Sequence, residues 1–77
     1  MIDLKKHIEF NPQKLYGKPV IAGTRIPVDL VLEKLASGIT VEDILEAYPN
    51  LTKENIYACL LFASESIKNE IFHPKAS

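Results

Sequence analysis

The chain has 77 residues, of which 47% are hydrophobic and 25% charged, and its formal net charge at pH 7 is −1. This length accommodates one domain, and the balance of apolar and charged residues is typical of a globular protein rather than a disordered one. No apolar run approaches the roughly 20 residues of a membrane span, and the N-terminus contains no signal-peptide core. We therefore expect a cytoplasmic protein without a membrane segment.

The charges are unevenly distributed along the chain. Residues 1–25 carry a net charge of +3, whereas residues 26–77 carry a net charge of −4. A basic N-terminal part can meet an anionic partner, and the acidic remainder can face solvent or a basic partner. In a chain this short, the same asymmetry can also arise by chance.

Side chains that could support catalysis or bind a metal are sparse. The single cysteine, Cys59, lies among apolar residues of a helical pattern, which predicts a small buried hydrophobic residue. The two histidines, His7 and His73, stand near opposite ends of the chain without the spacing of metal ligands. The carboxylates Glu42, Asp43 and Glu46 fit a solvated helix face, because no apolar surroundings would desolvate them. We expect no enzyme, no metal and no cofactor.

Residues 1–27 are predicted to form a strand followed by a β-hairpin. Residues 7–10 alternate between polar and apolar side chains, which indicates a short strand. Two β-branched runs, 19–22 and 25–28, flank Gly23 and Thr24, and a dipeptide with glycine first suits a type II′ hairpin turn. The predicted hairpin places Arg25, the only arginine, near its tip.

Residues 28–73 are predicted to form a body of three helices. In the first two helices, apolar residues recur at i, i+3, i+4 and i+7, which marks one buried stripe on each. These stripes are Val28, Val31, Leu32 and Leu35, then Val41, Ile44, Leu45 and Tyr48. Gly38 ends the first helix, Thr40 and Asp43 form a capping-box pattern before the second, and Pro49 ends the second.

The third predicted helix is the longest, and Thr52 can cap it. Its inward stripe consists of Ile56, Cys59, Leu60, Ala63, Ile67 and Ile71. Residues 59–62 are apolar on nearly every side, and a helix of this kind must be covered on both faces. Either the N-terminal strand or a second subunit can provide the second cover. We expect the subunit, which places Leu61 and Phe62 in a dimer interface.

The second and third helices, with the short turn 49–51 between them, have the dimensions of a helix-turn-helix. In that motif the start of the second helix enters the major groove of DNA. The residues predicted to face DNA are Asn50, Thr52, Lys53 and Tyr57. Because this helix carries few cations, Lys18 and Arg25 are expected to contact phosphate or an acidic partner.

A second interpretation uses the same features without DNA. Helix pairs joined by short turns are common in small helical proteins, and residues 26–77 are acidic. In this alternative the chain is a homodimeric protein-interaction module. The ribbon with Arg25 and the apolar ring around Leu61 and Phe62 then serve dimerisation and partner docking only.

Residues 17–28, with the segment Gly-Thr-Arg-Ile-Pro at 23–27, and residues 38–45 and 48–52 together resemble a known family. It is the group of short prokaryotic proteins catalogued as domain of unknown function 433, described as VapB-type antitoxin-like. The resemblance covers residues 17–63. It implies a mostly α, helix-turn-helix-like bundle preceded by a β-ribbon, usually dimeric.

The resemblance also implies a function in a type II toxin-antitoxin system. Family members are taken to neutralise a PIN-like ribonuclease toxin and to repress their own promoter by binding operator DNA. Many antitoxins of this type wrap their toxin with a flexible C-terminal arm, and this sequence predicts none. We therefore expect a folded surface to contact any toxin.

Overall fold

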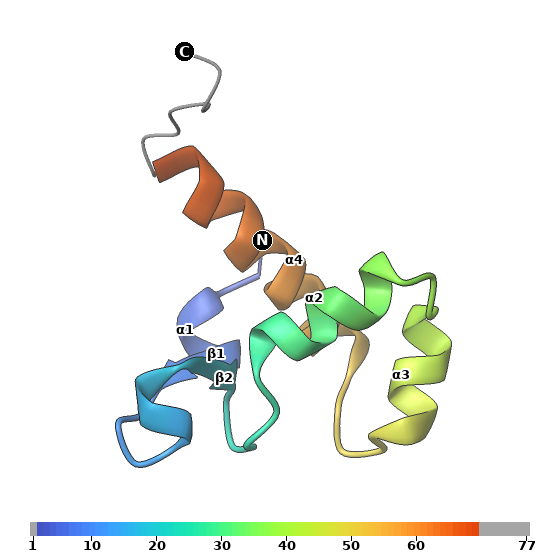
Figure 1. Ribbon diagram of the computed structural model, residues 1–77, viewed down its shortest axis with the longest axis horizontal. Helices are drawn as coiled ribbons and strands as arrows, with labels where there is room; N and C mark the ends of the chain where they lie inside the picture. The colour runs from blue at the N-terminus through green and yellow to red at the C-terminus, as the bar shows by residue number, and fades with distance from the viewer. Residues whose placement is uncertain (1, 70–77) are drawn as a thin grey trace.

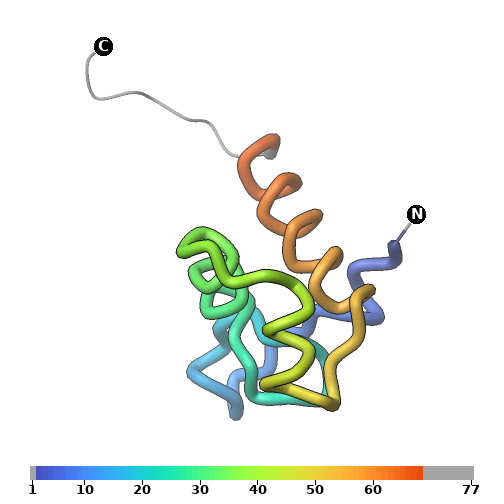
Figure 2. Tube along the Cα trace, turned by 90° about the vertical axis from the view of Figure 1, so that its right-hand side faces the viewer, coloured from blue at the N-terminus to red at the C-terminus, as the bar shows by residue number. Residues whose placement is uncertain are grey.

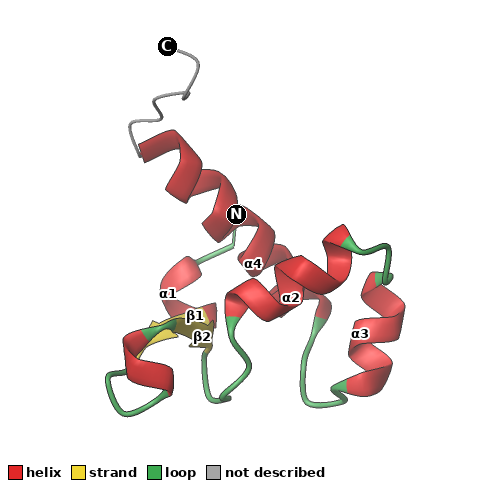
Figure 3. Cartoon of the chain, viewed as in Figure 1, coloured by secondary structure: helices red, strands yellow, loops and turns green. Residues whose placement is uncertain are grey.

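The computed structural model describes residues 2–69, and helices dominate this part of the chain (Figures 1 and 3). The elements in order are α1 (Leu4–His7), β1 (Ile8–Phe10), the 3₁₀ turn η1 (Leu15–Gly17), β2 (Pro19–Ile21), α2 (Val28–Ala36), α3 (Val41–Ala47) and α4 (Lys53–Asn69). The three-helix body preceded by strands is confirmed. The short helix α1, capped by the Asp3 carboxylate, was not predicted.

The two strands do not pair as the sequence predicts. β2 forms an antiparallel ladder with β1, with Ile8 opposite Ile21, and the predicted pairing within 19–28 is reduced to one bridge between Val20 and Pro27. Pro19 and Pro27 lack an N–H, so a hairpin between them would have few ladder hydrogen bonds. β1 supplies a better partner because Ile8 and Ile21 are then buried together in one core.

The turn after β2 also differs from the predicted type II′ turn. The Thr24 N–H donates to the Ile21 carbonyl over 3.0 Å, so the turn begins at Ile21, and Gly23 occupies its third position. Gly23 has φ +78°, which is the geometry of a type II turn, where glycine is favoured at this position. The Ile21 N–H donates to the Ile26 carbonyl over 2.9 Å and closes a loop over residues 22–25.

The core lies where the sheet meets α2, α3 and α4. Its buried residues are Ile8, Ile21, Val28, Val31, Ile44, Leu51, Ile56, Ala58 and Cys59. The stripes predicted for α2 and α3 are confirmed, since Val28, Val31 and Ile44 are buried and the remaining members pack against them. In two perpendicular views the C-terminal half of α4 extends away from this core (Figures 1 and 2).

The predicted inward stripe of α4 is wrong at two positions. Leu60 is 46% exposed and Ile67 is 73% exposed, while Ala58, which the stripe omitted, is completely buried. The N-terminal segment determines which side of α4 faces the core, because α1 packs against α4 and the ring of Phe10 lies 5.9 Å from that of Phe62. The N-terminal segment therefore covers the Phe62 side of α4. Ile71 lies outside the described residues.

Both predicted caps are present, with differences in detail. The Asp43 N–H donates to the Thr40 hydroxyl oxygen over 3.1 Å, but within the described residues the Asp43 carboxylate does not bond back to the Thr40 amide. At α4, the Asn55 N–H donates to Thr52 Oγ1, and the Thr52 N–H donates to Asn55 Oδ1 over 2.9 Å. This is a capping box closed by asparagine rather than glutamate. Asn55 Nδ2 also lies 3.0 Å from His7 Nδ1, which links α1 to the start of α4.

Truncation of Ile21 tests whether the β1–β2 ladder is part of the core. Ile21→Ala removes a side chain that is 1% exposed, so we expect a loss of about 2–5 kcal/mol in the free energy of unfolding. Urea denaturation followed by circular dichroism measures this loss. Glu33→Ala, on an exposed position of α2, is the control and should change stability by less than about 0.5 kcal/mol. A similar small change for Ile21→Ala would contradict the ladder.

Candidate nucleic-acid interface

The predicted helix-turn-helix corresponds to α3, α4 and the connection 48–52 between them. This connection is longer than the predicted three-residue turn, because α3 ends at Ala47 and α4 begins only at Lys53. Leu51 is 6% exposed and packs in the core, and its N–H donates to the Tyr48 carbonyl over 2.9 Å. The connection is therefore anchored by Leu51, while Pro49 and Asn50 face solvent.

All four residues predicted to face DNA are exposed, but they differ in which side-chain groups are free to contact DNA. Asn50 and Lys53 have no side-chain partner within residues 2–69. Thr52 accepts the Asn55 amide as a cap, and its hydroxyl hydrogen remains available to an anion. Tyr57 is 46% exposed one turn after Lys53, on the same helix face.

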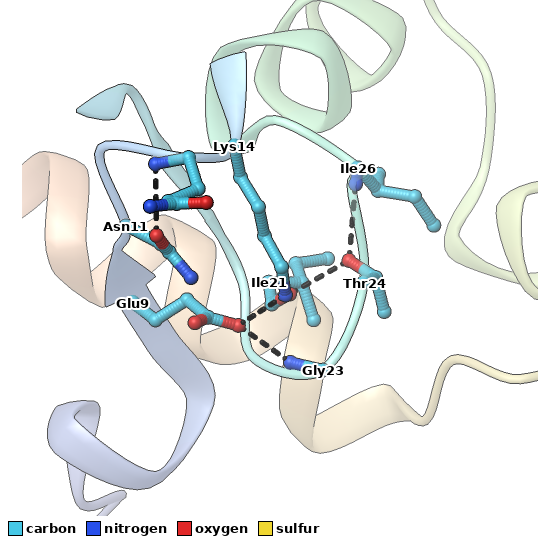
Figure 4. Close-up of polar contacts among 8 residues, drawn as sticks. Glu9, Asn11, Lys14, Ile21, Gly23, Thr24 and Ile26 are labelled. Carbon is cyan, nitrogen blue, oxygen red and sulfur yellow. Dashed lines mark hydrogen bonds and ion pairs between the residues drawn. The ribbon is translucent and has the colours of Figure 1, made fainter. Parts of the chain in front are cut away.

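Arg25 lies in the loop that follows β2, and Glu9 holds this loop in place (Figure 4). One carboxylate oxygen of Glu9 accepts the Gly23 N–H over 2.8 Å and the Lys14 ammonium over 3.0 Å. The Gly23 hydrogen bond is the larger cause and Lys14 the smaller, and together they lower the pKa of the Glu9 carboxyl below its ordinary value. We call this arrangement of Glu9, Lys14 and Gly23 the Glu9 clamp.

Thr24 completes the loop from inside. Its hydroxyl donates to the Ile21 carbonyl over 2.7 Å and accepts the Ile26 N–H over 3.0 Å (Figure 4). The backbone on both sides of Arg25 is thus fixed by hydrogen bonds. The Arg25 side chain itself is exposed and has no ion pair or hydrogen bond within the described part of the chain. The loop therefore presents one unpaired cation to solvent.

Lys18, the second predicted phosphate or partner contact, is paired within the chain. Its ammonium lies 2.9 Å from a carboxylate oxygen of Asp29, in the first turn of α2. The hydrogen bond from Lys18 is the main cause of a lowered pKa for Asp29. Both side chains are about half exposed, so Lys18 can contact an anion only in competition with Asp29.

Three connections lie at one end of the molecule. The segments 11–18, 22–26 and 48–52 all reach the lower edge in both views, whereas α4 begins higher, near the middle (Figures 1 and 2). The fold thus brings the loop that contains Arg25 to the same end as the connection that contains Asn50. Lys53 and Tyr57 follow on α4, farther from that edge.

The two residues predicted for a dimer interface have neighbours in the same chain. Phe62 packs on Phe10 and, with Leu4, Lys5 and Ile8, lines an open groove of about 330 Å³. Leu61 is partly buried. Phe10, which also lines this groove, is 61% exposed, so an aromatic side chain is accessible to a partner. We call this feature the Phe10 groove.

Metal and thiol chemistry find no support in the described residues. No group of three or more histidine, cysteine, aspartate or glutamate side chains within residues 2–69 is placed to hold a metal ion. Cys59 is buried, as predicted, and burial raises the pKa of its thiol to about 11, so it remains protonated at neutral pH. Among residues 2–69, no helix has both the length and the apolar character to cross a bilayer.

The segment from β1 through the first two-thirds of α4 is the part that known sequences share. The family model described as "Protein of unknown function (DUF433)" matches residues 8–63. The chain belongs to the DUF433 family. This match includes the Glu9 clamp and the connection between α3 and α4, and its description assigns no function.

One relative among curated proteins is the uncharacterized protein y4eO of Sinorhizobium fredii. It is 43% identical over 53 residues, which cover 69% of this chain and 24% of that protein. The aligned part of this chain therefore spans about a quarter of the relative's length. No solved structure matches the chain.

Sequence reasoning missed the Glu9 clamp and the pairing of Lys18 with Asp29. Both depend on where β1 and α2 lie relative to the loops 11–18 and 22–26, and neither leaves a local pattern. The alternation of residues 7–10 does place Glu9 on the face opposite Ile8. The contact of Glu9 with the Gly23 amide follows only from the pairing of β1 with β2.

The Glu9 clamp predicts a pH-dependent stability. Because the pKa of Glu9 is lowered in the folded chain, its stabilising effect is present at neutral pH and is lost as the pH falls through that lowered value. Glu9→Gln should lower the melting temperature at about pH 7, and the difference from wild type should shrink towards about pH 2. Thermal unfolding across this range measures it. Glu33→Gln, an exposed glutamate, is the control, and a pH-independent deficit in Glu9→Gln would contradict the clamp.

Proposed function

We propose that this protein binds DNA through the connection 48–52 and the start of α4, and that it acts as an antitoxin-like regulator. The observation that carries the proposal is the exposure of Asn50, Thr52 and Lys53 together, at the N-terminal end of a helix that follows a short connection from α3. Side chains of these types commonly contact phosphates. The amides at a helix N-terminus also favour an anion.

The loop that contains Arg25 supports the proposal from the same end of the molecule (Figure 1). Its guanidinium is unpaired in the described part of the chain, so its contact with a phosphate would break no existing ion pair. The exposed Glu54 beside Lys53 opposes an anion. A monomer would therefore contact few phosphates, and two copies on one operator would double that number.

The biological setting of the proposal comes from the family resemblance. Under it, the protein neutralises a PIN-like ribonuclease toxin of a type II toxin-antitoxin system and represses its own promoter as a homodimer. Under the proposal, Arg25 contacts an acidic surface of such a toxin, and Lys18 can do so only in competition with Asp29. Fold alone does not determine function, so DNA binding is the part of the proposal to test first.

Binding to duplex DNA across a salt series tests the proposal. We expect the protein to prefer the DNA upstream of its own gene over a scrambled duplex by about a thousandfold or more. Lys53→Ala should weaken binding by about tenfold and reduce the salt slope by roughly 0.9. Lys34→Ala, in the last turn of α2, is the matched control and should leave both quantities unchanged. An unchanged affinity and slope for Lys53→Ala would remove this residue from the interface.

The Phe10 groove favours a second candidate, a protein-interaction module without DNA binding. An exposed aromatic side chain over an apolar groove is a common anchor for a protein partner. In this case neither duplex should bind even at low salt, and a partner should stay bound after nuclease treatment. Phe10→Ser should then release that partner. Because Phe10 also packs on Phe62, circular dichroism of the free variant should show that it is still folded.

A further inference from the structure

One face of α4 is exposed between Tyr57 and Ile67 in the part of the chain that the structure describes. Its members follow at intervals of three, four and three residues and are all exposed: Tyr57, Leu60, Ser64 and Ile67. Tyr57 and Leu60 are each 46% exposed, and Ile67 is 73% exposed. The core residues Ile56 and Cys59 and the groove residue Phe62 lie on other sides of the helix. We call the exposed series the α4 seam.

The spacing of the α4 seam is that of a coiled coil. Alternating steps of three and four residues repeat every 3.5 residues on average and place the side chains in one line that faces another helix. Three large apolar side chains, Tyr57, Leu60 and Ile67, are exposed on this one face, and a group of this kind marks an interaction surface. The partner that best fits such a line is a second helix with the same repeat, and α4 of another copy has it.

We propose that the α4 seam packs antiparallel against the α4 seam of a second copy of this chain. In this arrangement Tyr57 meets Ile67 of the second copy, and Leu60 meets Ser64 of the second copy. The two-fold axis passes close to residue 62, between these layers. The proposal goes beyond DNA binding, and it assigns Tyr57 to the interface while Asn50, Thr52 and Lys53 stay accessible at its outer ends.

The charges that flank the α4 seam favour the antiparallel orientation. Glu54 and Lys68 lie on the same side of the seam, one near each end, and both are exposed. In an antiparallel pair, Glu54 of each copy lies towards Lys68 of the other copy, and these two side chains carry opposite charges. A parallel pair would instead place the two copies of Lys53 against each other. The intrachain contact of Lys68 with Glu65 spans 3.9 Å, and the Lys68 side chain is 70% exposed, so it is accessible to a further carboxylate.

This interface differs from the one that the sequence predicts. Phe62 lies on the opposite face of α4 and packs on Phe10 of the same chain, so it does not belong to the α4 seam. Leu61 borders the seam and is partly buried. The N-terminal segment therefore covers one face of α4, and the second copy covers the other.

Sedimentation velocity of the full chain over a concentration series tests the interface. Leu60→Glu and Ile67→Glu should each raise the dimer dissociation constant by about tenfold or more, because each places two carboxylates in the seam. Both side chains are exposed, so the far-ultraviolet circular dichroism of the monomer should not change. Ile39→Glu, an exposed isoleucine between α2 and α3, is the control and should dimerise as wild type does. A monomeric wild type, or dimers unaffected by both seam variants, would overturn the proposal.

A charge exchange tests the orientation. Glu54→Lys and Lys68→Glu should each weaken the dimer by a few-fold, and the double variant should recover most of the wild-type affinity. A double variant no better than either single one would exclude the antiparallel pairing. The DNA titration of Lys53→Ala reads out a separate property, so a failure of the dimer is distinguishable from a failure of DNA binding.

Discussion

The register between β1 and β2 is the constraint on which the rest of the structure depends. With Ile8 opposite Ile21, the alternation of a strand sends Ile8 and Phe10 towards the helices and Glu9 to the other face. Ile8 and Ile21 then complete the core, and Glu9 reaches the Gly23 amide that fixes the loop around Arg25. A slip of one residue would exchange these faces, so one ladder of three residue pairs determines both the packing of the core and the position of an exposed cation.

The same N-terminal segment determines which face of α4 is exposed. By packing α1 and Phe10 against the side of α4 that contains Phe62, it leaves the opposite side with Tyr57, Leu60 and Ile67 exposed. Besides the Phe10 groove, the helical body therefore has two separate exposed surfaces. One is the end where loops 22–26 and 48–52 meet solvent, and it is polar. The other is the face of α4 that contains Tyr57, Leu60 and Ile67. The proposed contacts with an anion and with a second helix would use different surfaces in this arrangement.

Much of the helical body could be predicted because its signals are local. The stripes of α2 and α3 and the caps at Thr40 and Thr52 follow from spacing within ten residues, and the structure contains them. The partner of β2 could not be predicted in this way. Gly23 and Thr24 indicated a turn at nearly the right place. A turn does not specify which strand pairs with β2, and the segment that follows the turn is a poor partner because Pro19 and Pro27 have no backbone N–H to donate.

The side of α4 that faces the core could not be predicted from local signals either. Residues 59–62 are all apolar, so periodicity cannot choose between Ala58 and Leu60 as the buried position; the element that packs on the helix makes that choice. The exposure of Asn50, Thr52 and Lys53 was predictable, since they flank the helix start outside any apolar pattern. The internal partners of Lys18 and Glu9 were not, because they lie on other elements.

Cys59 gives this fold an internal reporter of its own motions. Its side chain is completely buried where α4 meets the core, and the raised pKa of its thiol suppresses the thiolate that alkylating reagents attack. It is the only thiol in the chain. When closing is faster than labelling, the labelling rate is proportional to the fraction of molecules in which Cys59 is exposed, and that fraction gives the free energy of the opening that exposes it.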